Sequence, residues 1–89
     1  MVLTTQPITI ETGGPDQEGC LVLADGRLVA ALIRLSDAHE LMAGRWYLEH
    51  GFGPLDGPTH PTFPDLEAAQ AWIAGRLRER GRRWSRPRV

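Results

Sequence analysis

The chain of 89 residues is 42% hydrophobic and 24% charged, with a formal net charge of −1. This length allows one domain, and the composition is that of an ordinary soluble globular protein. No apolar run reaches the roughly 18 residues of a membrane span, the first residues lack the pattern of a secretory signal, and the single cysteine excludes an internal disulfide. We therefore expect a cytoplasmic protein without a membrane span.

The charges are unevenly distributed along the chain. Residues 1–74 hold three arginines and ten acids, a balance of −7, whereas residues 75–89 hold seven arginines and one acid, a balance of +6. Opposed halves of this kind predict a basic tail that either binds a partner or folds back onto the acidic body.

The first 19 residues carry few structural signals. Pro7 to Glu11 (PITIE) is rich in β-branched residues and begins with proline, which is typical of a short edge strand. Thr12 to Asp16 (TGGPD) is typical of a loop.

Residues 20–35 (CLVLADGRLVAALIRL) are predicted to form a β-hairpin. Asp25 and Gly26 favour a two-residue type I′ turn, because both central positions of that turn need a positive φ. This turn pairs Ala24 with Arg27, Leu23 with Leu28, Val22 with Val29 and Leu21 with Ala30. One face then carries Leu21, Leu23, Leu28, Ala30 and Leu32, and the other carries Cys20, Val22, Val29, Ala31, Ile33 and Leu35. The alternative is a helix from Leu28 to Met42, a segment rich in good helix formers.

The middle of the chain is predicted to contain one further strand between two connections. Residues 36–44 form the first connection, with a helical turn over Asp37 to Leu41. Arg45 to His50 (RWYLEH) alternates as a half-buried strand does. Gly51 to Pro61 (GFGPLDGPTHP) is rich in glycine and proline and is predicted to be a loop that crosses to the helix.

The strongest signal in the chain is a helix from Leu66 to Arg80. Asp65 is a good N-cap because its carboxylate can accept from the first free N–H groups of the helix, and Pro64 disfavours an earlier start. Gly81 suits the C′ position, where a left-handed residue ends many helices. One stripe with the helical period is apolar and should face the sheet; it consists of Leu66, Ala69, Ile73 and Leu77.

These elements predict an α+β fold with the order β-β-β-α. A small three-stranded antiparallel sheet, or a four-stranded one if residues 7–11 join it, would pack against the C-terminal helix. Residues 1–81 would form the domain and residues 82–89 a flexible basic tail. Because the hairpin is apolar on both faces and one helix covers only one, the amino-terminal segment, the 51–61 loop or a second copy of the chain must cover the other. A homodimer through this sheet face is therefore an expected partner.

The sequence shows no constellation that carries chemistry, so we expect no catalytic residues, no cofactor and no metal. His39, His50 and His60 are 11 and 10 residues apart, which matches no zinc pattern. Cys20 lies in an apolar strand, where a buried inert thiol is the rule. The acids are scattered singly, and the paired glycines lead into no helix and are followed by no phosphate-binding lysine.

The basic tail is the only segment with features of a ligand site. Arginines around one tryptophan could bind phosphates while the indole stacks on a base, and they could also bind an acidic protein or an anionic membrane surface. The alternative is a solvated end without a ligand. The candidate contact residues are Arg78, Arg82, Arg83, Trp84, Arg86 and Arg88.

Residues 45–77 resemble the end of small domains built from three strands and a helix. These include the amino-terminal DNA-binding domains of phage-type integrases and AP2-like domains. The matching residues are Trp46, Thr62, Phe63, Glu67, Ala68, Ala71 and Trp72. They are core or capping positions, so the resemblance implies a fold rather than a function. The DNA-reading sheet of those families is basic, whereas residues 1–74 here are net acidic.

Together these features predict a non-enzymatic interaction or regulatory module that acts through self-association or through its arginine-rich tail. The alternative is an accessory protein that binds nucleic acid with the Arg78–Arg88 segment.

Overall fold

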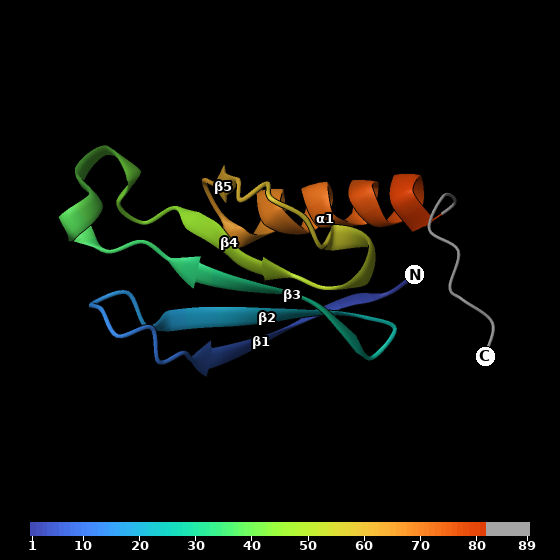
Figure 1. Ribbon diagram of the computed structural model, residues 1–89, viewed down its shortest axis with the longest axis horizontal. Coiled ribbons are helices and arrows are strands. Elements are labelled where there is room, and N and C mark those ends of the chain that lie inside the picture. Colours follow the sequence, from blue (N-terminus) through green and yellow to red (C-terminus); the bar gives the residue numbers. More distant parts are fainter. Residues whose placement is uncertain (82–89) are drawn as a thin grey trace.

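The computed structural model describes residues 1–81, which form a five-stranded antiparallel sheet with one long helix on one face (Figure 1). The strands lie in the sheet in chain order, and two short 3₁₀ helices, η1 and η2, flank the fourth strand. The elements are β1 (Leu3–Thr9), β2 (Glu18–Ala24), β3 (Arg27–Arg34), η1 (Asp37–Met42), β4 (Trp46–Gly51), η2 (Gly53–Leu55), β5 (Thr62–Phe63) and α1 (Leu66–Gly81). The predicted α+β class with a C-terminal helix is confirmed.

The predicted number of strands was too small. β1 extends over Leu3–Thr9 instead of the predicted residues 7–11, and β5 was not predicted. All residues of β1 after Leu3 are exposed, so the strand lacks the alternation of apolar and polar residues that marks a half-buried strand. β5 has only two residues, too few for any periodicity to be visible.

Proline at position 7 suits the place of β1 at the edge of the sheet. The hydrogen bonds Ile10 N–H to the Gln17 carbonyl and Asp25 N–H to the Val2 carbonyl show that even-numbered residues of this segment face β2. Because the N–H and C=O groups of successive residues in a strand point to opposite sides, the backbone of Pro7 faces the free edge of the sheet. There the missing N–H of proline removes no hydrogen bond between strands. The same proline limits pairing of this edge with another strand.

The predicted hairpin and its turn are confirmed, but the register holds only next to the turn. Asp25 and Gly26 have φ values of 51° and 80°, as a type I′ turn requires. Beyond Leu23–Leu28 the register shifts, so that Val22 pairs with Ala30 and Leu21 with Ala31. Val29 is the extra residue of this β-bulge. The predicted division of the hairpin into two faces was therefore wrong for Ala30, Ala31, Leu32 and Ile33.

A helix over residues 28–42, the alternative considered for this segment, is not formed. Arg27–Arg34 is a strand paired on both sides, and only Asp37–Met42 is helical, as the 3₁₀ helix η1. Pairing with two neighbours satisfies the backbone and buries the β-branched side chains of β3, which outweighs a preference for helix that is weak in these residues.

The helix α1 follows its prediction closely. Ala68 N–H donates to the Asp65 carboxylate at 2.7 Å, so Asp65 is the N-cap. The helix runs through Gly81, one residue beyond the predicted end. Ala69 and Ile73 are fully buried, while Leu66 and Leu77 pack at the margin of the core.

The hydrophobic core lies between α1 and one face of the sheet. Phe63 and Trp72 join β5 to the helix with ring centroids 5.5 Å apart, and the Arg76 guanidinium lies 5.0 Å above the Trp72 ring. Leu55 of η2 packs into the same core. The core consists of Cys20, Val22, Val29, Ala30, Leu32, Trp46, Leu48, Leu55, Phe63, Ala69 and Ile73.

Two glycines give a matched test of this packing. A Cβ at Gly51 would lie 2.2 Å from the Leu55 carbonyl oxygen, whereas a Cβ at Gly75 meets nothing within 4 Å. We expect Gly51→Ala to lower the free energy of unfolding by at least about 2 kcal/mol, because backbone must move. Gly75→Ala should raise it by about 1 kcal/mol through helix propensity. Urea unfolding followed by tryptophan fluorescence measures both, and equal effects of the two changes would contradict the packing of η2 against β4.

Candidate interaction face

The sheet has a second face, opposite α1, which we call the open face. Directly paired residues of an antiparallel sheet share a face, so the register assigns every paired strand position. Val29 and Glu49, at two irregularities of the pairing, have no direct partner. The open face carries Thr4, Gln6, Ile8, Gly19, Leu21, Leu23, Leu28, Ala31, Ile33, Tyr47, His50 and Thr62. Its centre, from β2 and β3, is almost entirely aliphatic.

The paired positions of the open face combine apolar character with an absence of formal charge. None of these paired positions is Asp, Glu, Lys or Arg. Ile8 and Leu28 are each 39% exposed, and Leu21, Leu23 and Ala31 between them are half-buried. Contiguous exposed apolar surface of this kind marks a site of interaction in a folded domain.

Neither intramolecular cover that the sequence suggested lies over the centre of this face. The amino-terminal segment joins the sheet in its plane as β1 (Figure 1). The 51–61 loop packs Leu55 into the core beneath α1 on the other face, and its ring contacts with the open face, Phe52 on His50 and His60 on Tyr47, lie on the β4 side. Of the three predicted covers, only a second copy of the chain is left for the centre of the open face, and this remains a prediction.

One end of the open face is covered by loops. Ile10 lies over Gly19, where a Cβ would meet its Cδ1 at 2.6 Å. The 12–16 loop and η1 flank a hollow of about 440 Å³ beside β3 and β4. Ile33 in its floor is only 3% exposed. The apolar lining comes from Pro15, Ile33, Leu35, Met42 and Tyr47.

Asp16 holds the two loops together. Its carboxylate accepts hydrogen bonds from Ser36 N–H, at 2.9 Å, and from His39 Nε2. The Ser36 hydroxyl is buried beside it without a well-aligned hydrogen bond. The pKa of Asp16 is lowered, because attraction by the Ser36 hydroxyl, by His39 and by the Ser36 N–H outweighs the opposing effect of burial.

The histidines take part in structural contacts. His60 Nδ1 lies 2.7 Å from the Leu48 carbonyl oxygen, and its ring stacks on Tyr47 at 5.7 Å. His50 meets the Phe52 ring edge-on at 4.4 Å. Within residues 1–81 no three His, Cys, Asp or Glu side chains are grouped so that they could hold a metal ion.

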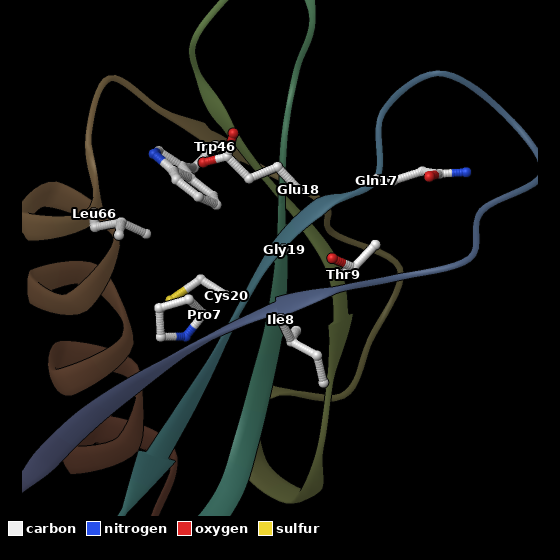
Figure 2. Close-up of a pocket in the computed structure, with 9 residues that line it drawn as sticks. All are labelled: Pro7, Ile8, Thr9, Gln17, Glu18, Gly19, Cys20, Trp46 and Leu66. Atoms are coloured by element: carbon white, nitrogen blue, oxygen red, sulfur yellow. The ribbon is translucent and has the colours of Figure 1, made fainter.

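A second concave surface, on the helix side, is a groove of about 720 Å³ between β1, β2 and the start of α1. Figure 2 shows Pro7, Cys20, Trp46 and Leu66 on the side toward the helix, whereas Ile8 points the other way. Burial raises the pKa of the Cys20 thiol, and the residue is 2% exposed. Cys20 is therefore a neutral, buried thiol, as its apolar strand predicted.

Of the six contact residues that the sequence predicted, only Arg78 lies among the described residues. Arg78 is exposed near the end of α1. Arg82, Arg83, Trp84, Arg86 and Arg88 lie outside the described residues. The Asp16–His39 contact and the hollow beside it were not predicted, because they join segments 23 residues apart that show no common motif.

Comparison with protein-family models, with curated proteins and with solved structures gives no match. The resemblance of residues 45–77 to integrase-type and AP2-like domains therefore has no further support. In the described part of the chain, no helix has both the length and the apolar character needed to cross a membrane.

Asp16 gives a pH-dependent test of the loop arrangement. Because its folded-state pKa is lowered, the ionised carboxylate stabilises the fold above the ordinary aspartate pKa of about 4, and this contribution is lost as the pH falls through the folded-state value. We expect Asp16→Asn to lower the free energy of unfolding at neutral pH. The difference from the wild type should shrink in acid.

Urea unfolding at a series of pH values measures this difference, with Asp56→Asn at an exposed position as the control. A difference between wild type and Asp16→Asn that stays constant down to strongly acid pH would contradict the assignment of the charge effect to Asp16.

Proposed function

We propose that this protein is a non-enzymatic interaction module that self-associates through the open face of its sheet. The observation that carries the proposal is the aliphatic centre of that face, Leu21, Leu23, Leu28 and Ala31, over which the described chain places no element. A buried, neutral Cys20 also supports a role other than nucleophilic catalysis.

A second copy of the chain suits this face in both shape and charge. A sheet face packs well against another sheet face about 10 Å away. The paired positions of this face carry no formal charge, so its centre can meet a second copy without repulsion, whereas a strongly charged partner would lose its hydration there without gaining an ion pair. Pairing at the free edge is the competing mode of assembly, and Pro7 disfavours it.

The size of the face indicates that surrounding loops also take part. Four strands about 4.8 Å apart and seven residues long span roughly 19 Å by 23 Å, or roughly 450 Å². A typical stable interface buries about 800 Å² on each partner. We therefore expect the loops at the ends of the sheet to contribute to a dimer of moderate affinity.

Two identical substitutions on opposite sides of the molecule test the proposal. Ala31 lies at the centre of the open face, and Ala71 is exposed on α1. We expect Ala31→Arg to weaken self-association at least about tenfold, because it brings charge into an apolar contact. Ala71→Arg should leave it unchanged, since arginine is nearly as good a helix former as alanine.

Sedimentation equilibrium over a wide concentration range measures the association, and circular dichroism confirms that both variants fold. Wild type and Ala71→Arg should sediment with twice the mass of the chain at high concentration. A wild-type protein that stays monomeric at about 1 mM would contradict the proposal. The basic segment that begins at Arg78 would then be the better candidate for contact with a partner.

A further inference from the structure

The hollow at one end of the open face has the size and lining of a small-molecule site. The β1–β2 loop and η1 lie at the same end of the sheet (Figure 1), and Asp16 joins them through its contacts with Ser36 and His39. The space that they flank beside β3 and β4 is about 440 Å³, within the range of roughly 300–1,000 Å³ that is usual for ligand pockets. Most of its lining is apolar, and the buried Ile33 lies in its floor. The hollow can therefore hold the apolar body of a small ligand.

The carboxylates that line the hollow outnumber the basic groups there. Asp16 and Glu49 line it, together with His39, which donates to Asp16. No arginine belongs to its described lining. Even with His39 protonated, the charge of Glu49 is therefore left without a counterion among the lining residues.

Two arginines close in sequence to the lining residues have other partners. Arg34 is ion-paired with Glu18 at 3.5 Å. Arg45 donates to the hydroxyl and the carbonyl oxygen of Thr62, at 3.1 and 3.2 Å. It precedes Glu49 by four residues, or roughly 13 Å of extended chain. A cation at Glu49 would therefore have to come from a ligand.

An irregularity of β4 brings Glu49 to the hollow. Ala31 pairs with His50 and Leu32 with Leu48, so that Glu49 is an extra residue without a direct partner. Alternation from Tyr47 places Glu49 on the open face, where it lines the hollow. In the described part of the chain its carboxylate makes no hydrogen bond and no ion pair. Bulges of this kind often aim a side chain at a site, and here the side chain carries a charge without a partner.

We infer that the hollow binds a small amine with an apolar body, whose ammonium group pairs with Glu49. The apolar body would contact Ile33, Leu35 and Met42. The ammonium group would also meet the ring of Tyr47, two residues from Glu49 on the same face, in a cation–π contact. An anion would be repelled by Glu49, and a neutral ligand would remove water from the carboxylate without replacing it by a counterion.

This inference does not rest on the proposed self-association. The residues that line the hollow include none of the aliphatic centre of the open face, which consists of Leu21, Leu23, Leu28 and Ala31. A failure of either proposal therefore leaves the other standing.

Three probes of similar shape and different charge test the inference. They are 2-phenylethylamine, which is a cation at neutral pH, the neutral 2-phenylethanol and the anion phenylacetate. Each is titrated into ¹⁵N-labelled protein, and the amide chemical shifts report both affinity and place. We expect the amine to bind with a Kd of roughly 1 mM, as is usual for so small a ligand. It should bind at least about fivefold tighter than the alcohol, and the anion weakest. The shifts should concentrate at Ile33, Leu35, Met42 and Glu49.

Two identical substitutions on opposite sides of the molecule separate the charge effect from other changes. Glu49→Gln keeps the shape of the side chain and removes its charge, so the amine should bind at least about fivefold more weakly while the alcohol binds as before. Glu67→Gln, at an exposed position in the first turn of α1, should change neither affinity. The amide spectra confirm that both variants fold.

Equal affinity of the wild type for the amine and the alcohol would overturn the inference, and so would a preference for the amine that survives in Glu49→Gln. Shifts confined to residues away from the hollow would also overturn it. So would the absence of any shift at about 10 mM amine.

Discussion

The structure is organised around one constraint: the β2–β3 hairpin is apolar on both faces, and a single helix can cover only one of them. The β-bulge at Val29 turns Val29 and Ala30 together toward α1, so that Val29, Ala30 and Leu32 join Cys20 and Val22 in one core. Leu21, Leu23, Leu28 and Ala31 are left on the other side. In a chain of this length the apolar surface available for burial is small. Burial of the open face against a partner would therefore add substantially to the apolar contacts that stabilise this chain.

The two ends of the sheet differ in the contacts that stabilise them. At one end, Asp16 links the β1–β2 loop to η1 through Ser36 and His39, and these segments flank a hollow beside the buried Ile33. At the turn end, the type I′ turn is stabilised by Val2 N–H, which donates to the Asp25 carboxylate at 2.8 Å, and Leu28 stays exposed beside it. One end thus offers a hollow and the other an exposed apolar side chain.

Local signals predicted those parts of the fold that depend on local chemistry. The Asp25–Gly26 turn, the Asp65 cap and the Ala69–Ile73 stripe each follow from a few adjacent residues, and each was predicted correctly. The edge strand β1 was predicted with the wrong bounds, because an exposed edge strand has no apolar period. The bulge at Val29 was not predicted, because neighbouring residues of an all-apolar strand give no signal for it. The Asp16–His39 contact depends on two loops meeting in space, which no spacing in the sequence encodes. The open face itself was foreseen as a surplus of apolar residues, although its membership changed with the register.

The most direct test of the account is the solvent exposure of the open face in solution. Methyl NMR with an inert soluble paramagnetic agent reports this exposure, and the chain supplies its own references, because Leu32 is fully buried and Leu41 is 96% exposed. The account predicts that at high protein concentration the Leu28 methyl signals are protected nearly as well as those of Leu32, and that dilution removes this protection. Leu28 signals attenuated at every concentration, as for a side chain open to solvent, would contradict it.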